Sequence, residues 1–462
     1  MADTSASHHV DVVILGAGSG GYACALRASK LDFSVILVEA DKVGGTCLHQ
    51  GCIPTKALLH AAEVADATRA AESFGIRTTF DGIDMAAVHA YKDSVVTRLY
   101  KGLEGLLTGP NITVVRGSGR YVGDRTVDVD GTSYTGGAVV LATGSAPRQI
   151  PGLTIDSRIM TSDQALRITD VPRAAIVLGG GVIGVEFASM WASFGSSVTI
   201  VEALPRLVAT EDTWTSTMLE RALARRGVTV NTGTAVTEAQ QNDDGVSVHL
   251  DNGTVLNADV LLVAVGRAPR SAGFAEAGIA TDRGFVTVDD RLACNHDGVY
   301  AVGDIVAGPQ LAHRGFAHGI HVAEGIAGLA PAPIDDALIP RVTYAHPEIA
   351  SVGLTEAAAR ALYRDITTFV YDLGGNGKSQ VLRTAGGVKV IRRGPADGTG
   401  PVVGVHMIGD RVSELIGEAQ LIVGWEALPT DVAPLIHAHP TQNEAIGEAM
   451  QALAGSPLHA HP

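Results

Sequence analysis

Residues 10–21 read VDVVILGAGSGG, an apolar run that leads into a glycine-rich turn. The run predicts a strand over 10–15, and the residues after the turn predict a helix over 22–30 and a second strand over 34–38. A strand, a glycine-rich turn, a helix and another strand form the start of a dinucleotide-binding unit. This order of elements predicts an α/β fold.

The same pattern occurs a second time further along the chain. A strand over 175–178 leads into GGGVIG, and a helix over 185–194 and a strand over 197–201 follow. The glycines of each turn let the backbone approach a pyrophosphate, and an acidic residue at the end of the second strand accepts ribose hydroxyls. The candidate binding residues are Gly16, Gly18, Gly21 and Glu39 in the first unit, and Gly179, Gly181, Gly184 and Glu202 in the second.

The acidic residue of the second unit bears on which dinucleotide binds there. NADP carries a 2′-phosphate, and sites for it usually hold an arginine near this position. Glu202 would instead repel the phosphate, at a cost of several kcal/mol where screening is poor. The second unit is therefore predicted to prefer NAD over NADP.

The composition of the chain excludes several classes of function. The 462 residues carry 34 basic and 49 acidic side chains, which gives a formal net charge of -15. A surface this acidic repels nucleic acid and anionic lipid, so neither is an expected partner. The N-terminus has no signal-peptide pattern, and no apolar run is long enough to span a membrane. We expect a cytoplasmic protein.

Residues 44–56 read GGTCLHQGCIPTK and hold two of the four cysteines, Cys47 and Cys52. Five residues of regular helix separate two Cα atoms by about 8.6 Å, whereas a disulfide needs less than about 7 Å. The two thiols can therefore pair only if the helix between them is broken. Pro54 is tolerated in the first turn of a helix, so it predicts that a helix over 53–65 begins near Cys52.

Three kinds of site remain open for this pair. A redox disulfide is favoured, because a close cysteine pair in a cytosolic protein is more often redox-active or metal-binding than structural. A metal site would need further ligands, and Cys24 and Cys294 supply no second pair, so no metal is expected. A purely structural role is the third reading. A thiolate at Cys52 would be stabilised by the helix N-terminus and by Lys56 one turn on.

In combination, six motifs resemble those of the flavin-dependent pyridine nucleotide-disulfide oxidoreductases. Within this family, they are most similar to the motifs of the members that oxidise dihydrolipoamide. The motifs are GAGSGG, GGTCLHQGCIPTK, ATGSAPR, GGGVIGVE, VYAVGD and HAHPTQNE, and they extend over nearly the whole chain. The resemblance implies two Rossmann-like dinucleotide-binding domains and a C-terminal α+β dimerisation domain. The implied segments are an FAD-binding domain over 1–148, an NAD-binding domain over 149–272, a segment over 273–340 that completes the FAD domain, and the dimerisation domain over 341–462.

The resemblance also implies which residues bind the two cofactors, FAD on the first glycine-rich turn and NAD on the second. The FAD residues are Gly16, Gly18, Gly21, Glu39, Thr46, Lys56, Gly119, Thr143, Gly144, Ser145, Asp304, Gln310, Leu311, Ala312 and His313. The NAD residues are Gly179, Gly181, Ile183, Gly184, Glu186, Glu202, Val236 and Gly266. Glu186 is also the expected ion partner of Lys56.

The two thiols have different roles by this resemblance, since Cys47 would exchange with a dithiol substrate while Cys52 faces the flavin. The substrate thiol must lose its proton before it attacks, and His439 in HAHPTQNE is the candidate base. Pro440 is expected to open a helix that carries Glu444 one turn inside, within reach of the imidazole ring. In relatives this segment comes from the other subunit of a homodimer. His437 and a second HAHP over 459–462 are weaker candidates, the latter a coincidence of sequence.

The implied activity is the NAD-linked oxidation of dihydrolipoamide carried by an acyltransferase or carrier protein of a 2-oxo acid dehydrogenase complex. Several relatives remain alternatives. Glutathione, mycothiol and trypanothione reductases share the cysteine pair but use NADPH, which Glu202 disfavours. A mercuric reductase normally has a further C-terminal cysteine pair, and a soluble transhydrogenase would lack the pair found here.

A non-catalytic FAD-binding subunit of a larger complex is an alternative of a different class. The presence of both cysteines, His439 and Glu444 argues against it.

Four residues depart from the commonest pattern of the family without removing a group that the chemistry needs: His49, Gln50, Arg314 and Cys294. The sequence suggests no role for His49 or Gln50.

Overall fold

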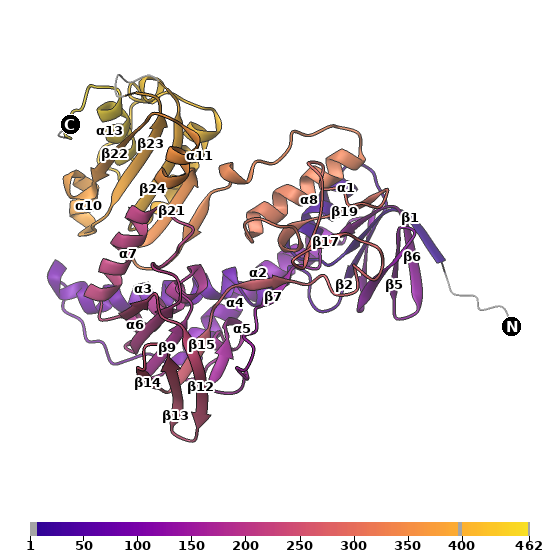
Figure 1. The fold of residues 1–462 in the computed structure, drawn as a ribbon, viewed down its shortest axis with the longest axis horizontal. Helices are drawn as coiled ribbons and strands as arrows, with labels where there is room; N and C mark the ends of the chain where they lie inside the picture. Colours follow the sequence, from indigo (N-terminus) through magenta and orange to yellow (C-terminus); the bar gives the residue numbers. More distant parts are fainter. Residues whose placement is uncertain (1–6, 396–399, 461–462) are drawn as a thin grey trace.

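The computed structural model of the chain describes residues 7–395 and 400–460 and contains three large β-sheets. Figure 1 shows the first sheet in the N-terminal part at the right, the second below and to the left, and the third near the C-terminus at the upper left. Helices cover each sheet, and buried aliphatic side chains fill the space between them. Among the described residues, no helix combines the length and hydropathy that a bilayer crossing demands.

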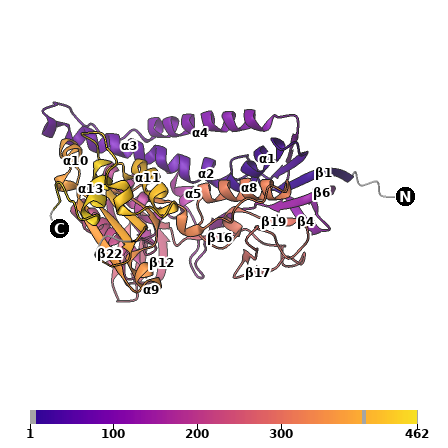
Figure 2. The ribbon, with the colours of Figure 1, turned by 90° about the horizontal axis from the view of Figure 1, so that it is seen from above.

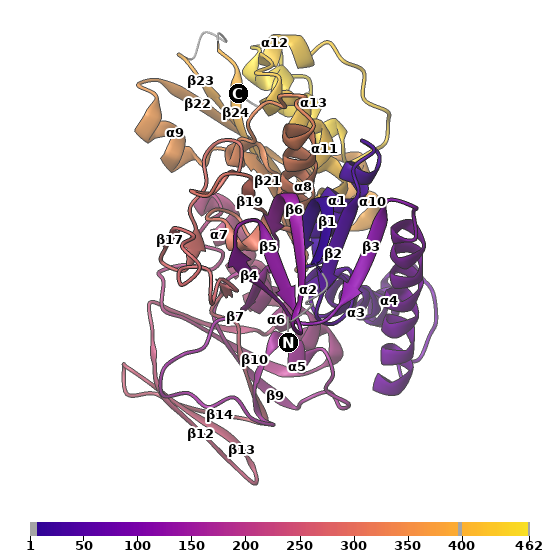
Figure 3. The same cartoon turned by 90° about the vertical axis from the view of Figure 1, so that its right-hand side faces the viewer.

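The first sheet has the order β3-β2-β1-β6-β5-β4, and β19 also pairs with β6. Its strands are β1 (Ser7–Leu15), β2 (Val35–Glu39), β3 (Ile112–Arg116), β4 (Gly119–Gly123), β5 (Thr126–Val129), β6 (Thr132–Leu141) and β19 (Val299–Ala301). The strands β1, β2, β3, β6 and β19 run parallel, and Figure 3 shows β1, β2, β3 and β6 side by side. Their continuous apolar runs follow from burial on both faces of the sheet.

Helix α1 (Ser19–Ser29) follows the first glycine-rich turn and packs closely against α8 (Ala312–Ile326). Glycines make this approach possible, because a Cβ at Gly319 would lie 2.2 Å from the carbonyl oxygen of Gly20. Cys24 is fully buried in the core that α1 covers, as expected for a small apolar side chain. A segment distant in sequence thus completes the N-terminal part with one strand and one helix.

The second sheet is parallel throughout, in the order β11-β10-β9-β15-β8. Its strands are β8 (Ile159–Thr161), β9 (Ala174–Leu178), β10 (Ser197–Glu202), β11 (Thr229–Thr232) and β15 (Val260–Val263), with helices α5 (Ser162–Ala165), α6 (Val182–Phe194) and α7 (Thr213–Arg225). An antiparallel meander lies beside it, formed by β12 (Val236–Asn242), β13 (Gly245–Leu250) and β14 (Val255–Ala258). Two short strands, β7 (Ser145–Pro147) and β16 (Arg267–Pro269), pair where the chain passes from the first sheet to the second and back.

The third sheet is antiparallel, in the order β20-β21-β24-β23-β22. Its strands are β20 (Arg341–Thr343), β21 (Glu348–Gly353), β22 (Ile366–Asp372), β23 (Gly387–Arg393) and β24 (Val402–Gly409). Helix α11 (Val412–Gly424) packs on β21 and β24, and α13 (Glu444–Leu453) packs on β22 and β23. Helices α9 (Glu356–Leu362), α10 (Gly377–Leu382) and α12 (Pro429–Val432) complete this part.

A long helical hairpin carries the cysteine pair. It consists of α2 (Gly45–His49), α3 (Cys52–Ala70), the 3-10 turn η1 (Ala71–Phe74) and α4 (Met85–Leu107). Figure 2 shows α3 and α4 lying along one side of the molecule. Helix α3 also contacts α6, and Lys56 near its start bonds to Glu186 of α6, so the start of α3 lies where the first part of the structure meets the second.

The helices after the two glycine-rich turns begin three residues earlier than the apolar pattern predicts. The expected starts are residues 22 and 185, whereas α1 begins at Ser19 and α6 at Val182. Gly18 and Gly181 are the N-caps and have extended backbone conformations. The helices begin directly after them, before the apolar periodicity does.

A buried ion cluster joins α7 to the third sheet. The Lys389 ammonium lies 2.8 Å from Asp212 and 2.7 Å from Glu356, and the Lys389 and Asp212 side chains are 6% and 2% exposed. Asp212 also caps α7 by accepting a hydrogen bond from the backbone N–H of Trp214 (2.9 Å). Lys389 therefore neutralises a carboxylate that fixes the second part of the structure against the third.

Replacing Lys389 by methionine is expected to lower the free energy of unfolding in urea by about 3–5 kcal/mol, because Asp212 then stays buried without a cation. Arg360→Met is the matched control, since Arg360 pairs with Glu356 through a side chain that is 60% exposed. That change should cost no more than about 0.5 kcal/mol. An equal decrease in the free energy of unfolding in the two variants would show that burial of the Lys389–Asp212 pair does not determine the size of the effect.

Candidate active site

The two glycine-rich turns have the same close-packed geometry. A Cβ at Gly21 would lie 1.8 Å from the carbonyl oxygen of Gly16, and one at Gly184 would lie 1.9 Å from that of Gly179. Gly16 and Gly179 also have φ angles of +104° and +109°, which side chains disfavour. These four positions accept glycine alone, as a phosphate-binding turn requires.

The middle glycine of each turn faces open space. A Cβ at Gly18 or Gly181 would meet no atom within 4 Å. Both residues are helix N-caps, and no side chain caps α1 or α6. The first N–H groups of both helices are therefore available to an anion, so the two turns fit the pyrophosphates of FAD and NAD.

The acidic residues that follow the two turns are held in equivalent positions. Glu39 accepts a hydrogen bond from the backbone N–H of Ala17 (2.7 Å), and Glu202 accepts one from Gly180 (2.6 Å). Each carboxylate is thereby fixed beside its own turn. This is the position from which an acid accepts ribose hydroxyls.

Four of the residues predicted for FAD surround the C-terminal ends of neighbouring strands. Thr143, Gly144 and Ser145 follow β6, and Asp304 lies in a 3-10 turn, η2 (Gly303–Ile305), after β19. Because β6 and β19 pair in parallel, their ends adjoin, and the Ser145 hydroxyl donates to Asp304 (2.6 Å). The structure therefore brings these two side chains together.

Helix α8 begins beside this turn with no side-chain cap, at the segment Gln310, Leu311, Ala312 and His313. Gln310 donates its amide N–H to the carbonyl oxygen of Asp304 (3.3 Å), whereas the His313 ring bonds to the carbonyl oxygen of Pro340 (2.7 Å). The backbone of this segment thus adjoins the predicted FAD site. The His313 side chain is engaged with the connection to the third sheet.

Of the other predicted cofactor residues, four lie on separate helices and strands, and Gly266 lies just before a strand. Thr46 lies in α2 and Gly119 begins β4, where a Cβ would lie 2.6 Å from the Leu15 side chain. A side chain at Gly119 would therefore have to displace core side chains. Ile183 lies in α6, Val236 begins β12, and Gly266 precedes β16 with a φ angle of +100°.

A break in the helix separates the two cysteines, as the spacing predicts. Cys47 lies in α2, which ends at His49, and α3 begins at Cys52. Gly51, the residue between them that caps α3, has φ and ψ angles of -149° and -111°, far from helical values. Both cysteines are free thiols, so the structure shows the dithiol form of the pair.

The two thiols differ in acidity. A hydrogen bond from Cys47 lowers the pKa of Cys52 to about 7, against the effect of burial and with the help of the Lys56 charge. The same bond, together with burial, raises the pKa of Cys47. As the pH rises through neutrality, Cys52 thus becomes the thiolate while Cys47 keeps its proton.

A fixed positive charge lies beside this pair. Both carboxylate oxygens of Glu186 lie 2.9 Å from the Lys56 ammonium, which confirms the expected ion pair. Glu186 also accepts a hydrogen bond from the backbone N–H of Tyr344 (3.0 Å), and Lys56 lies 4.7 Å from the centre of the Tyr344 ring. Burial opposes the charge on Lys56, but Glu186 raises the pKa of the amine and keeps it protonated.

His49 has a structural role that the sequence does not reveal. Its ring lies edge-on to Tyr100 of α4, with ring centres 5.1 Å apart, and bonds to the carbonyl oxygen of Val43 (2.9 Å). His49 thus ties the loop before Cys47 to α4. The sequence gives no signal of this contact, because Tyr100 lies far along the chain.

Arg314, another departure from the family pattern, is buried in α8. It forms a bidentate ion pair with Asp336, with distances of 2.7 and 2.9 Å, and donates to the carbonyl oxygen of Ala307 (2.6 Å). This arrangement anchors α8 to the connection that leads into the third sheet. Arg314 therefore has a structural role next to the predicted FAD site.

His439 and Glu444 form the predicted pair. The Nδ1 atom of His439 lies 2.9 Å from one Glu444 oxygen, and the backbone N–H of Thr441 donates to the other (2.8 Å). Partial burial raises the pKa of Glu444, but these hydrogen bonds outweigh this effect and lower the pKa below its usual value. Because a carboxylate only accepts, Nδ1 carries the proton and Nε2 is free to take another.

The expected helix start at Pro440 is wrong. Helix α13 begins at Glu444, and residues 442–443 form a turn. The Glu444 carboxylate accepts from the backbone N–H of Thr441, and this bond closes the turn ahead of the helix. Glu444 is therefore the first residue of the helix, and it reaches the imidazole from there.

One chain does not bring His439 to its own cysteine pair. Figure 1 places α13 and α2 in different parts of the molecule, and the His439 side chain is 77% exposed. On the same loop, Leu435 and Ile436 are 58% and 99% exposed. These two adjacent apolar side chains lie beside His439, and contiguous exposed apolar groups are a feature of surfaces that another chain covers.

The weaker histidine candidates each pair with a different carboxylate. His437 lies 2.8 Å from Glu418, and His459 lies 2.7 Å from Glu448. Neither is paired with Glu444. Residues 461–462, the end of the second HAHP, lie outside the described residues.

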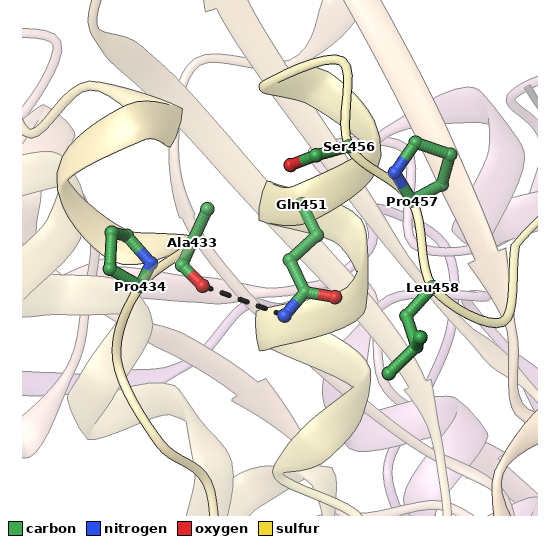
Figure 4. A pocket seen from close by; sticks show the side chains of 6 residues that line it. All are labelled: Ala433, Pro434, Gln451, Ser456, Pro457 and Leu458. Atoms are coloured by element: carbon green, nitrogen blue, oxygen red, sulfur yellow. Dashed lines mark hydrogen bonds between the residues drawn. The ribbon is translucent and has the colours of Figure 1, made fainter.

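A shallow hollow of about 340 Å³ lies between α12, α13 and the C-terminal segment. Figure 4 shows its lining of Ala433, Pro434, Gln451, Ser456, Pro457 and Leu458. It contains no titratable side chain and is separate from the cysteine pair. Elsewhere in the described chain, no group of three or more metal-binding side chains is arranged to hold an ion.

Comparisons with known proteins agree with this geometry. Residues 10–319 match the family described as pyridine nucleotide-disulphide oxidoreductase, and residues 339–450 match its dimerisation domain. A dihydrolipoyl dehydrogenase of Bacillus subtilis is 38% identical, with 97% of this chain and 99% of the relative covered. A second, from Thermus scotoductus, is 37% identical, with coverages of 97% and 98%.

Solved structures show the same fold. The flavoprotein disulfide reductase RclA of Escherichia coli superposes with a TM-score of 0.86 at 27% identity, and LpdA of Mycobacterium tuberculosis with 0.88 at 25%. In both cases 96% of this chain and 99% of the other are covered. The predicted α/β fold with its dimerisation domain is confirmed. The chain belongs to the pyridine nucleotide-disulphide oxidoreductases, enzymes that use FAD and NAD.

Proposed function

We propose that the chain oxidises dihydrolipoamide to lipoamide and reduces NAD⁺ to NADH. The observation that carries the proposal is the unequal acidity of Cys47 and Cys52, beside a half-buried lysine and a buried carboxylate. This inequality suits a disulfide that exchanges with a dithiol at one sulfur and passes electrons on from the other. Similarity to dihydrolipoyl dehydrogenases over nearly the full chain supports this choice of substrate.

The proposed reaction starts from the disulfide between Cys47 and Cys52. His439 of a second subunit takes the proton from one substrate thiol, and the resulting thiolate attacks the sulfur of Cys47. Cys52 leaves as a thiolate, which its low pKa favours. The second substrate thiol then attacks the sulfur of the substrate in the mixed disulfide, so lipoamide forms and Cys47 departs. One substrate proton ends on Cys47 and the other on His439.

FAD, when bound, accepts the electron pair from the dithiol and delivers it to NAD⁺. The chain's own contribution is to hold Cys52 and Lys56 at the start of α3, and we assign to FAD and NAD the two sets of residues named above. Lys56 stabilises the Cys52 thiolate through its charge. Glu444 orients His439 and stabilises the imidazolium that forms.

The match to a dimerisation domain supports a homodimer. In the proposed dimer, the exposed His439 loop of one subunit completes the site of the other. The dihydrolipoamide would be attached to an acyltransferase or carrier protein of a 2-oxo acid dehydrogenase complex. The exposed apolar residues beside His439 support the dimer in which this loop contacts a second subunit.

A substrate panel tests the proposed function. The purified holoenzyme is assayed for NAD-linked oxidation of dihydrolipoamide and for reduction of glutathione and mycothiol disulfides with NADH and NADPH. We expect kcat/KM for dihydrolipoamide to exceed the others by on the order of 10³-fold, because the pocket must match the substrate at the transition state. A higher value for another disulfide would reassign the substrate, and no turnover with any of them would indicate a non-catalytic subunit.

The choice of dinucleotide is a separate prediction. Glu202 is fixed beside the second turn, so the 2′-phosphate of NADPH would meet a carboxylate there. We expect kcat/KM to be about 10²-fold higher with NADH than with NADPH in reduction of lipoamide. Glu202→Gln should narrow this ratio by weakening the repulsion. A preference for NADPH in the unmodified enzyme would show that Glu202 does not set specificity.

A further inference from the structure

A directed chain of hydrogen bonds connects Arg267 to Asp304. The Arg267 Nε donates to the Ser145 hydroxyl oxygen (2.7 Å), and a second guanidinium nitrogen donates to the Ser145 carbonyl oxygen (2.9 Å). The Ser145 hydroxyl in turn donates to Oδ2 of Asp304 (2.6 Å). Because the guanidinium can only donate, the single hydroxyl proton of Ser145 must point toward the carboxylate.

This chain occupies one oxygen of Asp304 and leaves the other open. Among the described residues, no hydrogen bond reaches Oδ1 of Asp304, and this atom is not one of the buried unpaired ones. The backbone of the turn is held separately, because Gly303 N–H donates to His318 (3.3 Å) and Gln310 donates to the Asp304 carbonyl oxygen. Arg267 and Ser145 therefore determine only how the Asp304 carboxylate is turned.

Arg267 lies where the two nucleotide-binding parts of the structure join. It begins β16, directly after Gly266, and β16 pairs with β7, in which Ser145 lies. Burial lowers the pKa of Arg267, but the charges of Asp163 and Asp304 on either side of the junction oppose this effect. A partly buried cation is costly unless neighbouring acceptors are well placed. The contacts with Ser145 and Asp304 provide such acceptors.

We infer that Arg267 is a positioning residue for FAD, which acts through Ser145 to aim the free oxygen of Asp304 at a hydroxyl of the cofactor. This inference rests on the proposed assignment of Asp304 to FAD. Arg267 lies on β16, the strand that follows the NAD-binding part of the chain. The inference thus gives a residue of this strand a role in binding FAD. Arg267 itself need not touch FAD.

The test is the dissociation constant of FAD from the apoprotein, followed by the change in flavin fluorescence. Arg267→Gln should raise this constant by about 10- to 100-fold, the factor expected for loss of one or two charge-assisted hydrogen bonds. Arg267→Lys keeps the charge but lacks the planar fork, so it should recover only part of the loss. Ser145→Ala should weaken binding to a similar degree, and the double variant should be no weaker than the single ones.

Arg270→Gln is the matched control, because it removes a positive charge at the same junction. Its backbone is held at this junction, because the Arg270 N–H donates to the carbonyl oxygen of Gly144 (2.8 Å) and its carbonyl oxygen accepts from the Thr143 hydroxyl (2.5 Å), and its side chain is exposed. The FAD dissociation constant of Arg270→Gln should stay within about twofold of that of the unmodified protein, as for a surface charge without a specific contact. Circular dichroism of each apoprotein verifies folding.

Asp304→Asn separates the two ways in which the inference can fail. If Asp304→Asn leaves FAD binding unchanged, the assignment of Asp304 to FAD is wrong. If Asp304→Asn weakens binding but Arg267→Gln does not, only the role of Arg267 is overturned. Equal losses in Arg267→Gln and Arg270→Gln would show that the effect is one of net charge.

Discussion

Replacing Cys52 by serine is expected to reduce NAD-linked oxidation of dihydrolipoamide by at least about 10³-fold, because the disulfide can no longer form. The NAD turn is untouched by this change, so transfer of electrons from NADH to a quinone acceptor should persist. The long-wavelength absorbance that appears when two electrons are added to the unmodified protein should be absent, since it requires the Cys52 thiolate beside the flavin. A normal absorbance band in Cys52→Ser would contradict the assignment of the two thiols.

Cys47→Ser provides the matched comparison. This variant also lacks the disulfide and should lose dithiol turnover to a similar degree. It retains the Cys52 thiolate, however, so the absorbance band should be present without reduction. Because the hydrogen bond from Cys47 lowers the pKa of Cys52, Cys47→Ala, which has no donor at this position, should shift the appearance of the band to higher pH. An identical pH dependence would show that Lys56 alone sets the acidity.

His439→Gln is expected to lower kcat for dihydrolipoamide oxidation by about 10²- to 10⁴-fold, the range for loss of a general base. Electron transfer from NADH to a quinone should be unaffected, because no substrate thiol is deprotonated in that reaction. Glu444→Gln should have a smaller effect, since the imidazole keeps its free nitrogen but loses the carboxylate that orients it. A small effect of His439→Gln on both reactions would exclude this histidine as the base.

Local chemistry made much of the fold and site predictable from sequence. The glycine-rich turns, the strands around them and the break between Cys47 and Cys52 all depend on residues close together in the chain. Pro54 has a fixed φ angle, whereas glycine adopts backbone conformations that other residues disfavour, so the sequence alone indicates where the helix starts near Cys52. The start of α13 was not predictable in this way, because the contacts of the Glu444 carboxylate, rather than Pro440, determine it.

Contacts between distant segments were the part that sequence reasoning missed. His49 packs on Tyr100, Lys389 neutralises Asp212, and Arg267 bonds to Ser145. Each contact joins elements that meet only once the sheets have formed, and no spacing or periodicity records it. The ion pair between Lys56 and Glu186 is the exception, because the family resemblance suggested it in advance.

The most direct measurement uses mixed dimers of Cys47→Ser and His439→Gln subunits, assayed with dihydrolipoamide and NAD⁺. If His439 acts across the interface, each mixed dimer has one complete site, with both cysteines from one subunit and the histidine from the other. Random re-association of equal amounts should then restore about a quarter of the unmodified activity, since half of the dimers are mixed and each has one of two sites intact. Activity no higher than that of the two parent variants would contradict a site built from two subunits that oxidises dihydrolipoamide.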